Sequence, residues 1–160
     1  MGRIGFALTL AGAVALLTGC YPEPVACPAI ARATGVSLTV AATYAGDVGS
    51  LRLKACQDGS CTGKELVLHP GSVAVDQGCS PEGVCSATSS PDGTLQGFME
   101  LQALSEAPMQ ATVSGTSAAG AALPMRTLTF TPKGDYPFGE QCGRIITAAV
   151  VLDAAGLRQG

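Results

Sequence analysis

The chain has 160 residues, of which 47% are hydrophobic and 13% are charged, and its formal net charge is −3. A sparsely charged, weakly acidic surface argues against a nucleic-acid partner and against a polybasic lipid-binding face. The sequence has no tryptophan and a single histidine, which disfavours a stacked-ring sugar or base site and the commonest catalytic classes.

The N-terminus is typical of an exported protein. Arg3 precedes an apolar stretch over residues 4–17, which at about 14 residues is short for a permanent transmembrane helix of about 20. The stretch ends in "LTGC" (residues 17–20), which resembles the lipobox of bacterial lipoproteins. The resemblance implies thioether lipidation of Cys20, cleavage between Gly19 and Cys20, and acylation of the new amino terminus. The alternative is a plain signal peptide in which Cys20 stands by chance.

Three regions follow from this assignment. Residues 1–19 are expected to be the signal peptide, and residues 20–33 the lipidated cysteine with a tether. The tether contains "YPEPVACP", whose three prolines favour an extended conformation. Residues 34–160 are long enough to form one domain with a core of its own.

Short runs with period-two alternation predict strands in this domain. In the first run, for example, Val36, Leu38, Val40 and Ala42 fall on one face. The predicted strands are residues 36–42, 50–56, 65–68, 94–101, 109–114, 125–131 and 145–152. Turn signals separate them: "QDGS", "HPGS", "SPEG", "SPDG", "SAAG", "PKGD" and "DAAG". Seven or eight short strands at this spacing predict an all-β, antiparallel, immunoglobulin-like β-sandwich.

Six cysteines remain once Cys20 is set aside, and an even number in an exported chain predicts three disulfides that staple the fold. Cys56 and Cys61 flank "QDGS", and Cys79 and Cys85 flank "SPEGV", so each pair closes a small loop. Cys27 is then left to pair with Cys142 across a wide loop. The alternatives are a crossed pairing of the four middle cysteines, and a zinc site made of their four thiolates.

Catalytic candidates are few. A Ser–His–Asp or Cys–His enzyme would have to use His69, which stands in "LVLHPGS" and is more typical of a structural histidine. A glycosidase could use two carboxylates instead, but most acidic residues stand next to glycine or proline, where turn chemistry explains them. These residues are Asp47, Asp58, Asp76, Glu82, Asp92 and Asp135. We therefore expect a non-enzyme without metal or cofactor.

The domain also resembles small secreted or lipid-anchored actinobacterial domains of unassigned function. The segments that carry the resemblance are "ACQDGSC" (residues 55–61), "CSAT" (85–88), "GF" (97–98) and "YPFGEQCG" (136–143), where those domains usually show "YPNG" in place of "YPFG". The resemblance implies an immunoglobulin-like sandwich and no known active site.

These features predict a lipoprotein held on the extracytoplasmic face of the cell membrane through Cys20. Its expected role is that of a non-catalytic binding or structural module of the cell envelope, with an envelope protein as its partner. One alternative is a module that inhibits or scaffolds an exported enzyme, and another is an unrecognised hydrolase. An unpaired edge strand or an exposed apolar patch would favour partner binding, whereas a cleft with converging carboxylates would favour the hydrolase.

Overall fold

A computed structural model describes residues 26–29 and 33–160 of the chain. In these residues the chain forms ten strands, one short helix α1 (Ala42–Ala45) and a 3-10 turn η1 (Glu140–Cys142). The strands are β1 (Gly35–Val40), β2 (Val48–Gln57), β3 (Ser60–Glu65), β4 (His69–Cys79), β5 (Cys85–Glu100), β6 (Met109–Ser117), β7 (Arg126–Phe130), β8 (Lys133–Asp135), β9 (Ile145–Leu152) and β10 (Leu157–Gln159).

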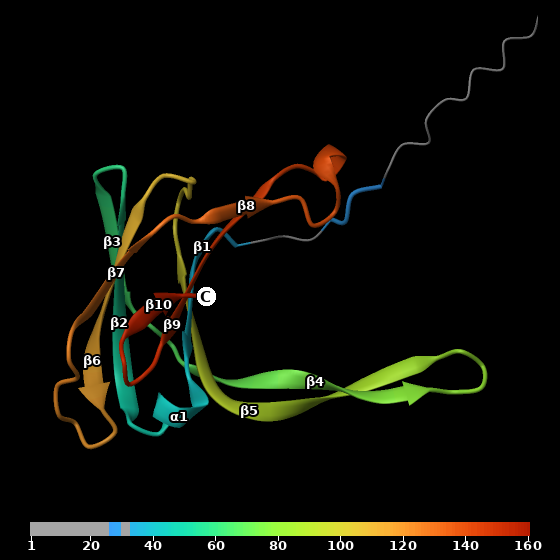
Figure 1. The fold of residues 1–160 in the computed structure, drawn as a ribbon, viewed down its shortest axis with the longest axis horizontal. Coiled ribbons are helices and arrows are strands. Elements are labelled where there is room, and N and C mark those ends of the chain that lie inside the picture. Colours follow the sequence, from blue (N-terminus) through green and yellow to red (C-terminus); the bar gives the residue numbers. More distant parts are fainter. Residues whose placement is uncertain (1–25, 30–32) are drawn as a thin grey trace, which may run out of the picture.

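The strands form two sheets that pack face to face, which confirms the predicted all-β sandwich (Figure 1). The larger sheet has the order β10-β9-β1-β5-β4, with β8 also paired to β9, and the smaller sheet has the order β3-β2-β6-β7. Ten strands are described instead of the predicted seven or eight. The additional strands include β3, β8 and β10, which are short and carry no clear apolar alternation.

The sequence predicted antiparallel pairing throughout. One pair differs, because β1 runs parallel to β9. Val36 lies opposite Ala148, and Val40 lies opposite Leu152. Parallel neighbours need a long connection in place of a hairpin turn. Here that connection is most of the domain, so no local turn signal in the sequence could mark the pair.

The core lies between the two sheets and is made by the predicted alternating faces. Val36, Leu38 and Val40 of β1 are fully buried, whereas Ala42, predicted to continue this face, is exposed in α1. The chain turns there because the amide of Ala45 bonds to the carbonyl of Ala41 and closes one helical turn. The other buried apolar residues are Val48, Leu51, Leu53, Ala55, Leu66, Met99, Met109, Ala111, Val113, Phe130, Ala148, Val150 and Leu152.

Residues 66–68, predicted to belong to a strand, instead carry the chain from one sheet to the other. β3 in the smaller sheet ends at Glu65, and β4 in the larger sheet begins at His69. Leu66 is buried in the core between them, and its amide donates to the carbonyl of Leu51 at 2.8 Å. Beyond this bond residues 66–68 belong to no strand, so their apolar side chains mislead a strand prediction.

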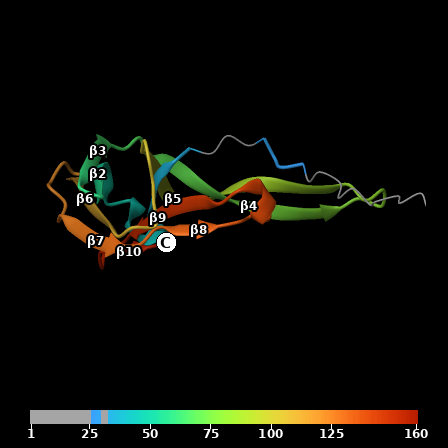
Figure 2. The ribbon, with the colours of Figure 1, turned by 90° about the horizontal axis from the view of Figure 1, so that it is seen from above.

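β4 and β5 extend far beyond the sandwich as a two-stranded ribbon, which Figures 1 and 2 show reaching away from both sheets. β5 has 16 residues, but only its last six pair with β1. The predicted turns "HPGS" and "SPDG" both lie within these strands, where Pro70 pairs with Leu95 and Ser72 with Pro91 across a register shift. Glycine and proline therefore mark a bulge here and not a turn.

The remaining turn signals have mixed outcomes. The segments "QDGS", "SPEG", "SAAG" and "DAAG" are turns, each with a glycine at positive φ: Gly59, Gly83, Gly120 and Gly156. The segment "PKGD" instead forms β8, which pairs with the start of β9.

Candidate functional site

The projecting part of the β4–β5 hairpin, residues 72–91, is called the ribbon below. Apart from Ser90, which is half-buried, every side chain in it is exposed. The ribbon therefore adds no residue to the sandwich core. An isolated two-stranded hairpin is marginally stable in water, so the ribbon depends on contacts of its own.

Those contacts lie along the ribbon and at its tip. The Cys79–Cys85 disulfide joins the ends of the two strands, with Cα atoms 3.8 Å apart. The side-chain amide of Gln77 donates to the hydroxyl of Thr88 across the strands at 3.1 Å. The carboxylate of Asp76 accepts the amide of Gly78 at 2.8 Å, where the chain has positive φ. These links hold the ribbon as a defined element.

A compact polar lock between Asp92 and Thr94 of β5 lies at the base of the ribbon. One oxygen of Asp92 accepts both the amide and the hydroxyl of Thr94, at 2.9 and 2.7 Å. The hydrogen bonds from the Thr94 hydroxyl and amide lower the pKa of the Asp92 carboxyl below its ordinary value. Gly71 is buried against this pair, and a Cβ atom there would collide with the Thr94 hydroxyl. Glycine at position 71 is thus required by close packing.

The surface of the ribbon combines apolar and acidic groups. Val73 and Val75 are 51% and 41% exposed, and they lie opposite Ser90 and Thr88, so all four share one face. Val84 in the tip is 69% exposed. The chain contains no lysine or arginine between residues 65 and 125. The charges on the ribbon are therefore all negative.

Both long edges of the ribbon are unpaired within the part of the chain that the structure describes. β4 is the last strand of the larger sheet, and residues 85–91 of β5 pair only with β4. Natural edge strands are commonly protected by lysine, proline or a covering segment. Residues 72–75 of β4 carry no charge and no proline. The unpaired edge strand that favours partner binding is therefore present.

His69 lies at the base of the ribbon, at the start of β4. It lines a shallow depression of about 310 Å³ together with Ser37, Thr39, Gln96 and Phe98, and no carboxylate is among the described residues that line it. A catalytic histidine needs an orienting group and a nucleophile within hydrogen-bond reach. The nearby Ser37 hydroxyl donates instead to the carbonyl of Ala148. This arrangement gives no support to a Ser–His–Asp site.

The acidic residues singled out in the sequence are dispersed and serve local structure. Asp76 and Asp92 bind amides two residues ahead, and Asp135 binds the amide of Tyr136 at 2.7 Å. A hydrogen bond from the Ser80 side chain lowers the pKa of the exposed Glu82. Within residues 26–29 and 33–160, no three His, Cys, Asp or Glu side chains gather closely enough to hold a metal ion.

A cleft of about 720 Å³ lies beside the β2–β3 hairpin and residues 100–103, and nothing in the sequence pattern marked it. Its charged residues are Asp58, Lys64 and Glu100. Gln57 in the wall of the cleft bonds to the loop between β5 and β6. Its side-chain amide donates to the carbonyls of Ser105 and Ala107 at 3.0 and 2.8 Å. The Asp58 carboxylate accepts the hydroxyl of Ser105. Gln57 and Asp58 therefore hold the loop that contains Ser105 and Ala107.

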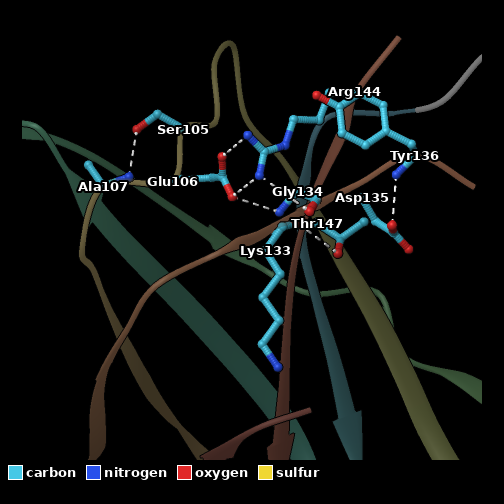
Figure 3. Close-up of polar contacts among 9 residues, drawn as sticks. All are labelled: Ser105, Glu106, Ala107, Lys133, Gly134, Asp135, Tyr136, Arg144 and Thr147. Carbon is cyan, nitrogen blue, oxygen red and sulfur yellow. Dashed lines mark hydrogen bonds and ion pairs between the residues drawn. The ribbon is translucent and has the colours of Figure 1, made fainter. Parts of the chain in front are cut away.

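A second polar cluster, the clamp, lies where β8 meets β9 (Figure 3). Arg144 binds both oxygens of Glu106 at 2.7 Å, and Glu106 also accepts the amide of Gly134 at 3.0 Å. The guanidinium of Arg144 lies over the ring of Tyr136, 5.7 Å from its centre. The clamp joins the loop before β6 to the segment between β8 and β9.

The disulfides are the three pairs predicted first from the spacing. Cys56 and Cys61 are directly opposed in the β2–β3 hairpin around a two-residue turn at Asp58 and Gly59. Because all six cysteines form disulfides, neither the crossed pairing nor the zinc site is present. Three disulfides are typical of an extracytoplasmic protein.

The third disulfide, Cys27–Cys142, fixes the segment before the domain to the last residue of η1, with Cα atoms 5.3 Å apart. Cys20 itself, the predicted lipidation site, lies outside the described residues, as does the predicted signal peptide. In the described residues no helix has the length and hydropathy needed to cross a bilayer.

No family model matches the chain, and no curated protein and no solved structure is similar to it. The resemblances to bacterial lipoproteins and to actinobacterial domains therefore stay predictions from the sequence.

Proposed function

We propose that the protein is a lipoprotein, anchored through Cys20 on the outer face of the cell membrane, which binds an envelope protein through the ribbon without catalysing a reaction. The observation that carries this proposal is the ribbon itself. It contributes no residue to the core, yet a disulfide at its tip and the Asp92–Thr94 lock at its base maintain it. The ribbon is held by contacts of its own but adds nothing to the core of the domain. Such an element is suited to contact with another molecule.

The chemistry of the ribbon indicates what kind of surface would complement it. Val73 and Val75 offer apolar contact, and the unpaired β4 edge offers backbone donors and acceptors to an added strand. The carboxylates of Asp76 and Glu82 are not balanced by any nearby lysine or arginine in the sequence. The partner is therefore a protein with an extended segment flanked by basic residues, and its association weakens as salt is raised.

Inhibition of an exported enzyme is the second candidate function, and the ribbon tip favours it. The tip is convex and closed by Cys79–Cys85, and it presents Val84 with 69% exposure. Such a loop fits an enzyme cleft, since a preformed loop loses little conformational freedom when it binds. The two candidates differ in which part of the ribbon touches the partner.

Site-specific photo-crosslinking in intact cells distinguishes these candidates. A photoreactive amino acid is placed at Val75 on the ribbon face, at Val84 in the tip, or at Met125, which is 70% exposed outside the ribbon and serves as control. Envelope binding predicts one discrete adduct from Val75 and none from Met125. An adduct from Val84 alone supports the inhibitor, and equal adducts from all three positions contradict both.

The anchor is tested separately. Cys20→Ser removes the thiol that the lipobox would acylate, so metabolic palmitate labelling should be lost and the protein should accumulate as an uncleaved precursor or in soluble form. Labelling that persists in the Cys20→Ser variant would contradict the lipoprotein assignment. Cys27→Ser is the matched control, because it removes a nearby cysteine outside the lipobox and should leave labelling intact.

A further inference from the structure

The Cys27–Cys142 disulfide determines which end of the domain lies near the proposed anchor. Cys27 lies seven positions after Cys20, and seven steps of the chain span at most about 25 Å even when fully extended. Cys27 is bonded to Cys142, so this limit also applies to the loop between β8 and β9. A lipid at Cys20 therefore holds that loop close to the bilayer.

This loop presents aromatic side chains at the surface. Residues 136–139 are called the aromatic loop; they comprise Tyr136, which is 41% exposed, then an exposed proline, the half-buried Phe138, and Gly139. Tyrosine and other amphipathic rings are enriched at membrane–water interfaces, where an apolar body and a polar tip are both satisfied.

The aromatic loop is held in a fixed conformation. The amide of Gly139 donates to the carbonyl of Tyr136 at 2.9 Å, and the amide of Tyr136 donates to the Asp135 carboxylate at 2.7 Å. The side-chain amide of Gln141 donates to the carbonyl of Phe138 at 3.1 Å. These bonds therefore keep the Tyr136 ring exposed, and the guanidinium of Arg144 in the clamp lies over one face of the ring.

We propose that the aromatic loop rests on the lipid surface and sets the orientation of the domain on the membrane. The proposal rests on the lipid anchor of the proposed function. Two rings alone are too small an apolar surface to bind vesicles, but a short tether raises their effective concentration at the bilayer to the millimolar range or above. Contact therefore requires the anchor.

Electrostatic attraction to anionic lipids is not expected to drive this contact. The positive charges near the aromatic loop are Lys133 and Arg144, and Arg144 is already paired with Glu106. Asp135 precedes the aromatic loop, and Glu140 follows it. Because the local charges are balanced or slightly negative, the aromatic loop should contact neutral and anionic bilayers alike.

The absence of tryptophan from the chain provides a direct test. Tyr136→Trp introduces a single tryptophan in the aromatic loop, and Val84→Trp introduces one at the ribbon tip as control. Each lipidated protein is reconstituted into phosphatidylcholine vesicles with and without brominated acyl chains. Contact predicts a blue-shifted emission for Tyr136→Trp and quenching at least about twofold stronger than for Val84→Trp, as expected for a ring at the interface. Phe138→Trp is a second probe in case the Tyr136 variant disturbs the clamp.

Equal quenching of the aromatic-loop and tip variants would overturn the proposal. A blue shift at Tyr136→Trp without bromine quenching would also overturn it, because protein, such as a second copy of the chain, would then cover the aromatic loop. Failure of the anchor is recognised independently by the absence of palmitate on Cys20. In that case the free Cys20 thiol of residues 20–160 is coupled to a maleimide phospholipid, and the same quenching comparison decides whether the aromatic loop meets the bilayer.

Discussion

Asp92 forms the polar lock at the base of the ribbon with Thr94, and its protonation can be followed directly. Its carboxylate accepts two hydrogen bonds from Thr94, which lower its pKa in the folded protein below the ordinary value of 3.8. A lowered folded pKa means that this contribution to stability is complete above the unfolded pKa and is lost as pH falls through the folded pKa. The lock should therefore survive to a lower pH than an ordinary aspartate would allow.

The amide proton of Thr94, followed by NMR, reports this titration. We expect its shift to change with a midpoint below 3.8, and Asp92→Asn should abolish the change. Asp76→Asn is the matched control, since its carboxylate binds a different amide, that of Gly78. A midpoint at or above 3.8 in the unaltered protein would show that the lock does not form in solution.

His69 is expected to contribute little, although it is the single histidine. It lies in a shallow depression without a described carboxylate, so His69→Ala should change the free energy of unfolding by less than about 0.5 kcal/mol, as for other surface substitutions. Thermal unfolding measures the effect of His69→Ala on stability, and the crosslinking yield from Val75 measures its effect on partner binding. A hundredfold loss of function with unchanged folding, the magnitude typical of a lost general base, would instead make His69 a catalytic candidate.

At the scale of elements, the disulfides should differ in what they stabilise. Cys27–Cys142 closes a loop with a sequence separation of 115, and the chain-entropy model gives such a link up to about 4–5 kcal/mol. Cys79–Cys85, with a separation of 6, lies at the tip of a ribbon that contributes no residue to the core. The double variant Cys27→Ser/Cys142→Ser should therefore lower global stability by several kcal/mol, within the bound that the model sets.

The double variant Cys79→Ser/Cys85→Ser should leave the global unfolding transition within about 0.5 kcal/mol, because the ribbon lies outside the cooperative core. Hydrogen exchange should nevertheless accelerate in residues 72–91 alone. Calorimetry and amide exchange on the two double variants measure both effects. If Cys79→Ser/Cys85→Ser lowered the global stability more than Cys27→Ser/Cys142→Ser, the ribbon would be part of the cooperative core, and this prediction would be wrong.

The elements that the sequence predicts well are those with one buried face. β9 has the predicted bounds, and the alternating apolar residues of β2 and β6 are buried as expected. The ribbon half of β5 could not be found in this way, because neither of its faces is buried and apolar alternation is absent. The bulge between β4 and β5 contains Gly71 and Pro91, which the sequence pattern assigns to two turns, "HPGS" and "SPDG". Glycine and proline occur in both bulges and turns.

The candidate site was predictable only in part. Spacing predicted the Cys79–Cys85 loop, and an unpaired edge was named as a feature that would favour partner binding. The length of the ribbon depends on strand register, and the packing of Gly71 against Thr94 and the clamp between Glu106 and Arg144 are contacts between residues far apart in the sequence. No local pattern in the sequence encodes such contacts.

In the whole molecule, the proposed anchoring end and the proposed binding element are different parts of the fold. Cys27–Cys142 and the aromatic loop belong to the end beside the proposed lipid, whereas the ribbon leaves the sandwich as an independent projection (Figure 2). The sandwich supports both of them. Removing the ribbon should therefore abolish binding while it preserves the fold and the anchor.

A shortened variant tests this claim most directly. Val73 and Ser90 are directly opposed, so residues 74–89 can be replaced by Asn-Gly, which closes a two-residue hairpin. Met125→Ser is the control that removes an exposed apolar side chain elsewhere. The partner is first identified by its crosslink to Val75 in the unshortened chain, and the measurement is then its co-purification, without crosslinking, with each variant. We predict that the shortened variant stays membrane-anchored, keeps its melting temperature within a few degrees and loses at least about tenfold in capture, while the control captures normally. Undiminished capture by a folded, anchored, shortened variant would contradict the account.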